Sequence, residues 1–218
     1  IKEVSAAIGS DTRIGNKFLL SSPGFGGSCF KKDILNLVYL SRYYGLDPVA
    51  EYWENVISLN NWQKERISQV IVDKLFGTIT GKKIVLLGFS FKANTNDIRE
   101  SPSIDIAKNL LENGAKLVIN DPRVSKKQIE LALNQQSKEI DDFKDSIWHY
   151  ESNILEAVKS ADAVVILTEW QEYKNLNWNL IAERMRKPSW VFDTRGIINN
   201  KKIDGTSINL WTLGKGQI

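Results

Sequence analysis

The residues that could carry out chemistry are concentrated in residues 22–33, with the sequence Ser-Pro-Gly-Phe-Gly-Gly-Ser-Cys-Phe-Lys-Lys-Asp. Three glycines in four positions let the backbone approach a ligand closely, and a helix expected from about residue 28 directs its free N–H groups toward that ligand. We expect Cys29 in the first turn of this helix. The helix N-terminus and the neighbouring Lys31 and Lys32 both favour the thiolate, which is the nucleophilic form of cysteine.

Asp33 follows Cys29 by four residues, which places it one helical turn on and on the same face. A carboxylate at that position can orient or activate a water molecule next to the sulfur. The structural alternatives are a small buried hydrophobic side chain for Cys29 and a solvated acid that stabilises the helix dipole for Asp33. The glycines and flanking lysines favour the chemical interpretation of Cys29, and spacing alone leaves both roles of Asp33 open.

The elements that must position this segment divide the chain near residue 80. Before that point, apolar residues follow a helical period through residues 34–40. A second helix is predicted from Pro48 to about residue 76, N-capped by Asp47 and interrupted by a polar patch at residues 60–66. This helix would be on the order of 40 Å long. Helices of this length span two domains or pack in a subunit interface, and we expect both roles.

After residue 80 the pattern changes to alternating strands and helices. Strands are predicted at residues 83–88, 116–120, 162–167 and 190–193, and helices at residues 101–113, 154–159 and 180–186. This alternation predicts an α/β fold, a Rossmann-like parallel sheet with helices on its faces. Residues 134–147 are expected to form a long surface loop. We therefore divide the chain into a helical segment, 1–78, with the cysteine loop and a dimerisation surface, and a nucleotide-binding domain, 79–218.

The composition is that of an ordinary water-soluble globular protein, with 218 residues, 42% of them hydrophobic, and a net charge of +3. The evenly spread charge gives no reason to expect binding to nucleic acid or a membrane surface, and no Cys/His cluster indicates a metal site. A single cysteine excludes an intramolecular disulfide and fits a reducing compartment, so we expect a cytoplasmic protein. Because the chain begins with Ile and has no signal peptide, we expect it to be part of a longer protein.

Residues 24–33, with Arg13-Ile-Gly-Asn-Lys-Phe upstream, closely resemble the active-site segment of the UDP-glucose 6-dehydrogenase branch of the UDP-glucose/GDP-mannose dehydrogenase family. The resemblance covers essentially the whole chain, in the same order, through GFSFK at 88–92, DIRES at 97–101, DP at 121–122, TEW at 168–170 and FDTR at 192–195. Members of this family are longer and begin with an NAD-binding domain. The GxGxxG loop of that domain, a catalytic Glu, and a Lys and an Asn of the early central helix have no counterpart here.

The resemblance implies a Rossmann-like UDP-binding domain and two successive oxidations of UDP-glucose at C6, with NAD⁺, to UDP-glucuronate. It implies that Cys29 forms a thiohemiacetal and then a thioester, and that Asp33 assists the hydrolysis. The cofactor-binding residues that it implies are Cys29, Lys32 and Arg99. The substrate-binding residues that it implies are Arg13, Phe18, Leu20, Ser21, Gly24, Phe25, Gly26, Phe91, Lys92 and Arg195.

Some of these residues have more specific implied roles. Arg13 resembles an arginine that crosses a dimer interface to the substrate of the neighbouring subunit, so the implied partner is a second copy of the chain in a homodimer or a larger homo-oligomer. Lys92 would neutralise diphosphate charge, and Arg99 would reach the cofactor pyrophosphate. Leu20 replaces a Lys often found in animal enzymes, so its backbone rather than its side chain would contact the substrate.

Two other interpretations stay open. The chain could belong to a sister nucleotide-sugar dehydrogenase that acts on GDP-mannose or a UDP-N-acetylhexosamine. The N-acetylhexosamine branch usually has His before the catalytic Cys and lacks the Lys-Asp pair, so Ser28, Lys32 and Asp33 favour UDP-glucose. Alternatively, the isolated chain is a UDP-sugar-binding and dimerisation fragment without activity, because the main site of the hydride acceptor is missing.

Overall fold

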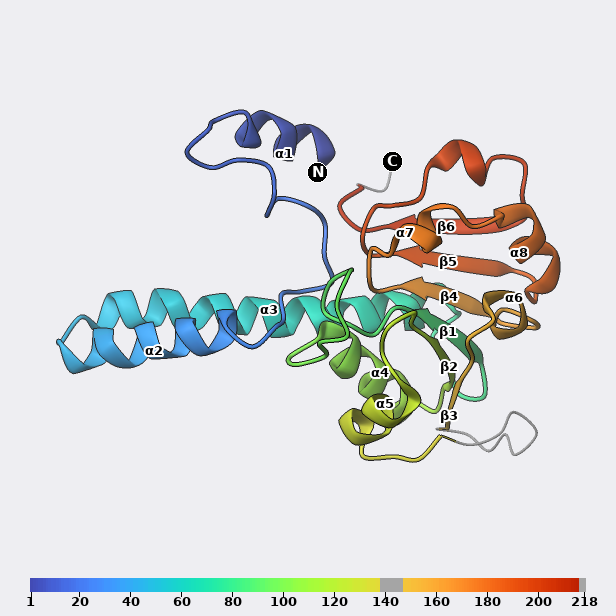
Figure 1. Cartoon of the computed structure of the whole chain (residues 1–218), viewed down its shortest axis with the longest axis horizontal. Helices are drawn as coiled ribbons and strands as arrows, with labels where there is room; N and C mark the ends of the chain where they lie inside the picture. The colour runs from blue at the N-terminus through green and yellow to red at the C-terminus, as the bar shows by residue number, and fades with distance from the viewer. Residues whose placement is uncertain (138–146, 216–218) are drawn as a thin grey trace.

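The structure is a computed structural model that describes residues 1–137 and 147–215 (Figure 1). Within these residues the helices are α1 (Lys2–Gly9), α2 (Phe30–Tyr43), α3 (Asp47–Lys74), α4 (Pro102–Glu112), α5 (Lys126–Leu133), α6 (Ile154–Ala157), α7 (Gln171–Lys174), α8 (Trp178–Arg184) and the 3₁₀ helix η2 (Asn200–Lys202). The strands are β1 (Lys83–Leu87), β2 (Lys116–Asn120), β3 (Trp148–Tyr150), β4 (Ala163–Ile166), β5 (Ser189–Asp193) and β6 (Ile208–Thr212). None of the helices in the described ranges has both the length and the apolar character needed to cross a bilayer.

The strands of the described residues form one parallel sheet in the order β3-β2-β1-β4-β5-β6. The chain builds one half of the sheet from β1 outward to β3, returns to the centre, and builds the other half from β4 outward to β6. This order is that of a doubly wound Rossmann fold, and it opens a crevice at the carboxyl ends of β1 and β4. The predicted Rossmann-like α/β fold is therefore confirmed.

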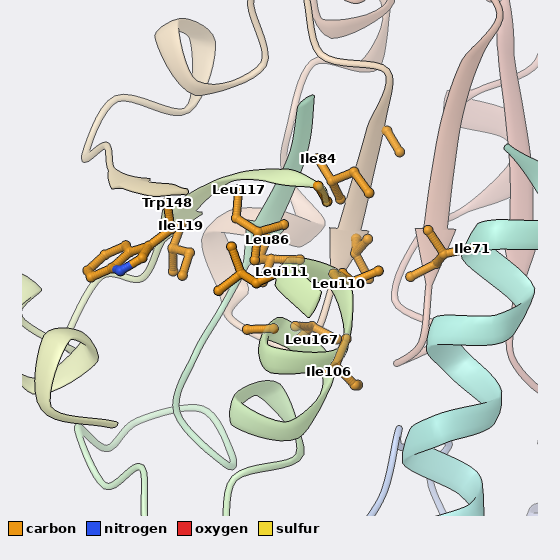
Figure 2. Packing of buried hydrophobic residues seen from close by; sticks show 14 of the residues in the cluster. Ile71, Ile84, Leu86, Ile106, Leu110, Leu111, Leu117, Ile119, Trp148 and Leu167 are labelled. Atoms are coloured by element: carbon orange, nitrogen blue, oxygen red, sulfur yellow. The ribbon is translucent and has the colours of Figure 1, made fainter. Parts of the chain in front are cut away.

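Helices cover both faces of the sheet, which explains why the central strands are apolar throughout. In β1, Ile84 and Leu86 belong to the core under α3, α4 and α5, whereas Val85 and Leu87 belong to the core under α6, α7 and α8. All four side chains are fully buried. Figure 2 shows the first core, in which Ile71 of α3 joins side chains of α4 and of the strands. Complete burial of an aliphatic side chain of this size contributes about 1.5–3 kcal/mol.

α2 and α3 form an antiparallel pair that projects away from the sheet (Figure 1). Both helices of the pair have buried side chains, among them Val38 of α2 and Ala50 of α3. In its second half, α3 continues over the sheet, where Ile67 and Ile71 enter the first core. The single long helix predicted from the sequence is confirmed, and it connects the helical pair to the sheet.

The start of α2 differs from the prediction. The helix begins at Phe30, so Cys29 is its N-cap and does not lie in the first turn. The physical reason is Gly27, which has a positive φ of 91° and donates its N–H to the Arg99 carbonyl oxygen at 2.8 Å. These two constraints hold the chain before Phe30 outside the helix.

The start of α3 also differs, by one residue. Leu46, not Asp47, is the N-cap, and Pro48 is the second helical residue. Leu46 has a non-helical ψ of 56°, and its carbonyl oxygen accepts hydrogen bonds from the N–H groups of Val49 and Ala50 at 3.0 and 3.1 Å. Asp47 therefore lies in the first turn, where its negative charge interacts favourably with the helix dipole and stabilises the helix.

Several elements are observed where none was predicted. The two edge strands, β3 and β6, lie at the outer ends of the sheet, and α1, α5 and α7 were also absent from the prediction. β3 has only three residues and α7 only four, too few to establish a period. Of the loop expected at residues 134–147, residues 138–146 lie outside the described residues.

Asp121, directly after β2, organises the carboxyl edge of the sheet. It is buried, and its two oxygens accept hydrogen bonds of 2.7–3.3 Å from N–H groups of three different loops: those of Phe89, Ser90, Arg123, Val124 and the Trp170 indole. A buried carboxylate is stable only when its lone pairs are satisfied in this way. The loops after β1, β2 and β4 are consequently fixed relative to one another.

We predict that Asp121→Asn lowers the free energy of unfolding by about 2–4 kcal/mol, because the amide replaces an acceptor oxygen with an NH₂ group that faces N–H donors. Denaturant titration followed by tryptophan fluorescence measures this change. Asp204→Asn, the same substitution at an exposed position, is the control and should change stability by less than about 0.5 kcal/mol. Equal effects of the two variants would contradict the role assigned to Asp121.

Candidate active site

Cys29 lies on the surface at the N-terminus of α2. Its thiol is exposed, and its Sγ lies 3.6 Å from the Ser28 hydroxyl. The Asp33 N–H donates to the Cys29 carbonyl oxygen at 2.8 Å, which makes Asp33 the residue one turn further along the helix. Lys32 and Asp33 are both exposed. The structure therefore brings a thiol, a carboxylate and an ammonium group together at one exposed helix end, as the spacing predicted.

Residues 22–29, which we call the Cys29 loop, pack against residues 97–100, which we call the 97–100 turn. Besides the hydrogen bond from Gly27, the ammonium of Lys31 makes an ion pair of 2.8 Å with the Glu100 carboxylate. Gly26 lies so close to the turn that a Cβ atom there would be 2.3 Å from the Glu100 carbonyl oxygen. Only glycine fits at position 26, and the loop cannot shift toward the turn.

Phe91 and Lys92 lie in the loop that follows β1, at the carboxyl ends of the central strands. The ring of Phe91 lies under the Cys29 loop, since a Cβ atom at Gly27 would be 3.1 Å from it. Lys92 is exposed, with its ammonium 5.3 Å from the centre of the Phe91 ring. An exposed lysine at this crevice is a suitable partner for a phosphate group. The predicted substrate residues Gly24, Phe25, Gly26, Phe91 and Lys92 thus lie at or next to the contact between the two parts of the chain.

Arg195 lies beneath the Phe91 loop rather than on the surface. Its side chain is only 9% exposed, and it donates to the carbonyl oxygens of Phe91 at 3.0 Å and Leu167 at 2.7 Å. It also makes an ion pair of 3.1 Å with Glu169. Burial lowers the pKa of the Arg195 guanidinium, and the Glu169 carboxylate opposes that shift. Arg195 therefore fixes the backbone of the loop that carries Lys92.

Arg99 presents a cationic group next to Cys29. Its guanidinium makes hydrogen bonds of 2.7–3.2 Å with both carboxylate oxygens of Asp97, which raise the pKa of Arg99 and lower that of Asp97. Cys29 lies near enough to Arg99 to make a smaller electrostatic contribution to the raised pKa of Arg99. The guanidinium remains 67% exposed. Lys32 and Arg99 thus offer accessible positive charge beside the thiol, which fits an anionic dinucleotide.

Phe18, Leu20 and Ser21 line a groove of about 500 Å³ that continues from the Cys29 loop. The opposite walls are formed by Gln63 and Arg66 of α3 and by residues 213–215. Phe18 and Leu20 are 95% and 71% exposed, so nothing in the described chain covers this side of the groove. Its open shape and its arginine suit an elongated anionic ligand.

Arg13 is not brought to this site. It lies in the segment after α1, with its side chain 87% exposed and hydrogen-bonded to Asp11. An exposed arginine held in a fixed direction by its neighbour is available to a second molecule. The predicted contact of Arg13 with the substrate of another subunit therefore stays a prediction.

Three residues that hold the site were not predicted. Asn60 of α3 makes two hydrogen bonds with the backbone of Phe25, Glu100 pairs with Lys31, and Glu169 pairs with Arg195. The polar patch at residues 60–66 was a signal for Asn60, because polar residues interrupt the apolar period of a long helix there. No local pattern indicates the partners of Glu100 or Glu169, which are distant in sequence.

Two family profiles match the chain. The profile of the UDP-binding domain of the UDP-glucose/GDP-mannose dehydrogenase family matches residues 85–200, and that of the central domain of the same family matches residues 1–62. The chain belongs to the UDP-glucose/GDP-mannose dehydrogenase family. The resemblance stated from the motifs is thereby confirmed, and the crevice at β1 and β4 lies in the UDP-binding domain of this family.

Individual members of the family are similar to this chain over nearly its whole length. The UDP-glucose 6-dehydrogenase of Gallus gallus is 45% identical over 217 residues, which is 99% of this chain and 44% of that protein. UDP-glucose 6-dehydrogenase 2 of Arabidopsis thaliana is 43% identical, over 99% of this chain and 47% of that protein. A UDP-glucose dehydrogenase structure from Pyrobaculum islandicum has a TM-score of 0.74 at 27% identity, over 96% of this chain and 42% of that chain. The chain therefore spans less than half the length of these relatives.

We predict that Arg195→Ala lowers the free energy of unfolding by about 2–4 kcal/mol, because two buried carbonyl oxygens and the Glu169 carboxylate lose their partner. Arg42→Ala, which removes the exposed Arg42–Glu54 ion pair, is the matched control and should cost less than about 1 kcal/mol. Urea titrations of the three proteins measure both effects. A loss for Arg195→Ala no larger than that for Arg42→Ala would show that Arg195 does not hold the loop.

Proposed function

We propose that this chain is the part of an NAD-dependent UDP-glucose 6-dehydrogenase that supplies the catalytic thiol and the UDP-sugar site. The observation that carries the proposal is the position of Cys29, exposed at the start of α2 and held against the crevice of the UDP-binding domain. Oxidation of a nucleotide-linked sugar to the carboxylate requires a nucleophile next to the nucleotide-binding crevice. The relatives named UDP-glucose 6-dehydrogenase support the choice of substrate.

The thiol explains how an alcohol can reach the carboxylate level. Removal of one hydride from C6 and of the proton from its hydroxyl gives an aldehyde, which has no tetrahedral carbon from which a second hydride can leave. The Cys29 thiolate adds to C6 and forms a thiohemiacetal, and loss of hydride from that carbon leaves a thioester on Cys29. Water then attacks C6, the C–S bond breaks, the thiolate is restored, and Asp33 accepts a proton of the attacking water. The product is UDP-glucuronate.

The remaining predicted residues hold the UDP-sugar in this scheme. Lys92 neutralises charge on the diphosphate, the Cys29 loop wraps around the diphosphate and the sugar, and Phe91 packs under the sugar. Phe18, Leu20 and Ser21 bind along the groove, where Leu20 contributes its backbone. Arg195 supports the Phe91 carbonyl from below, so its contribution to substrate binding is exerted through the loop.

When bound, NAD⁺ supplies the hydride acceptor for both oxidations. Of the described residues, Arg99 and Lys32 would hold its charged groups beside Cys29, which agrees with their exposure. We also propose that the chain divides into functional segments at residues 78 and 79, and that Arg13 reaches the substrate of a second copy in a homodimer. The single thiol, which must stay reduced to act, supports a cytoplasmic location.

We predict that Cys29→Ser in the complete enzyme abolishes formation of UDP-glucuronate, because the Ser hydroxyl is a much weaker nucleophile than a thiolate. Product formation is measured by chromatography with UDP-glucose and NAD⁺. Ser28→Ala changes the neighbouring hydroxyl only and serves as the control. Wild-type product formation by Cys29→Ser would remove Cys29 from the mechanism.

We predict that Lys92→Ala weakens binding of UDP-glucose to the 218-residue chain by about 1.5–3 kcal/mol, the usual contribution of a hydrogen bond to a charged group. Isothermal titration calorimetry measures the affinity. Lys201→Ala removes an exposed lysine of η2 and should leave the affinity unchanged. Equal affinities of all three proteins would place the Lys92 side chain in solvent.

A further inference from the structure

We propose that Asn60 is the positioning residue for Cys29, holding the Cys29 loop on α3 so that the thiol faces the UDP-sugar crevice. This inference rests on the proposed function, because it concerns the geometry of that nucleophile. It assigns a role to Asn60, the first residue of the polar patch in the middle of α3.

The side-chain amide of Asn60 pairs with the backbone of Phe25 in both directions. Its Oδ1 accepts a hydrogen bond from the Phe25 N–H at 2.8 Å, and its Nδ2 donates to the Phe25 carbonyl oxygen at 3.2 Å. Asn60 is half-buried, and so is Phe25. The amide therefore satisfies both backbone polar groups of one loop residue, as a neighbouring strand would.

The next turn of α3 completes this contact. Lys64 is buried, with its side chain 6% exposed, and its ammonium makes an ion pair of 2.5 Å with Asp105 of α4. At Gly24, a Cβ atom would lie 2.9 Å from the Asn60 Oδ1 and 3.3 Å from the Lys64 Cγ. The loop thus lies directly on a surface formed by α3 and α4, and the pairing of Asn60 with Phe25 sets where along α3 it sits.

A path of direct contacts connects Asn60 to the nucleophile. The ring of Phe25 packs edge-on against the ring of Phe30, with their centres 4.9 Å apart. Phe30 is the first residue of α2 and follows Cys29 directly. Asn60 therefore fixes the Phe25 backbone, and Phe25 fixes the start of the helix that presents the thiol.

The second support of the loop comes from the other side, at the 97–100 turn. That turn accepts a hydrogen bond from the Gly27 N–H and pairs with the Lys31 ammonium, so it holds the part of the chain that follows Phe25. Without Asn60 the loop would be fixed at one end only, and the sulfur could depart from the position needed for addition to a carbonyl carbon. Misplacement of a reacting group by about 1 Å can cost a hundredfold in rate.

The test uses Asn60→Ala in the complete enzyme, with Asn61→Ala as the matched control, since Asn61 is the adjacent, exposed residue of α3. Alanine is the better helix former, so α3 itself is not weakened. We expect kcat for UDP-glucuronate formation, per folded molecule, to fall about tenfold or more in Asn60→Ala, with the KM for NAD⁺ unchanged and Asn61→Ala unaffected. Asn60→Asp keeps the acceptor for the Phe25 N–H but loses the donor, and should give an intermediate kcat.

A purely structural role would lower the melting temperature and leave kcat per folded molecule at the wild-type value, and that result would overturn the proposal. A second measurement does not depend on the activity. In the 218-residue chain, exchange of the Phe25 amide hydrogen should accelerate about fivefold in Asn60→Ala, the effect of losing one hydrogen bond. The rate of Cys29 alkylation by iodoacetamide, followed by intact mass, should change in Asn60→Ala and stay constant in Asn61→Ala.

These measurements separate the two proposals. Absence of turnover in the wild-type complete enzyme would reject the proposed function, and the exchange and alkylation rates would still decide whether Asn60 controls the Cys29 loop. Unchanged exchange and alkylation rates in Asn60→Ala would reject the positioning role even if the enzyme forms UDP-glucuronate.

Discussion

The arrangement of the UDP-binding crevice depends on one buried negative charge, the carboxylate of Asp121. Removing a carboxylate from water costs several kcal/mol unless its oxygens are satisfied, and here N–H groups of the loops after β1, β2 and β4 must converge on it. The same convergence places Phe91 and Lys92 at the point where the sheet reverses its order. Arg195 acts from the opposite side, where a buried positive charge is satisfied by the carbonyl oxygen of Phe91 and by Glu169. The loop that carries Lys92 is thus fixed between a buried anion and a buried cation.

The position of the Cys29 thiol depends on a different constraint, the contact of the Cys29 loop with two supports that belong to different parts of the chain. One support is Asn60 in the middle of α3, and the other is the 97–100 turn, which precedes α4. Because α3 is continuous from the helical pair to the sheet, both supports belong to one packed unit. The fold therefore couples the position of the Cys29 thiol to that of the loop after β1, although Phe91 follows Cys29 by 62 positions in the chain.

Those features that arise from local patterns could be predicted from the sequence. The central strands are runs of residues such as Ile84 to Leu87, buried on both faces, and the spacing of Cys29 and Asp33 fixed their common position at a helix end. The three-residue strand β3 has no detectable period. The N-cap role of Cys29 depends on the hydrogen bond from the Gly27 N–H to the carbonyl oxygen of Arg99, which lies 72 residues after Gly27. For the same reason the sequence alone could not indicate that Arg195 points inward, since its partners lie in the loops after β1 and β4. The resemblance to a known family predicts which residues bind substrate and cofactor, whereas the structure shows which side chains hold the loops of the candidate site in place.

The continuity of α3 also restricts how its sequence can vary in length. Asn60 faces the Cys29 loop, and seven residues later Ile67 faces the sheet core, so both directions are set by the rotation of one uninterrupted helix. A single residue inserted or deleted between them would turn Asn60 by about 100° relative to Ile67 and move it along the axis by about 1.5 Å. A side-chain substitution in this interval leaves that rotation unchanged. A change in the number of residues does not, because α3 is continuous from Asp47 to Lys74 and no loop is available to absorb it. The stretch between Asn60 and Ile67 is therefore a fixed-length spacer whose residue count is part of the active-site geometry.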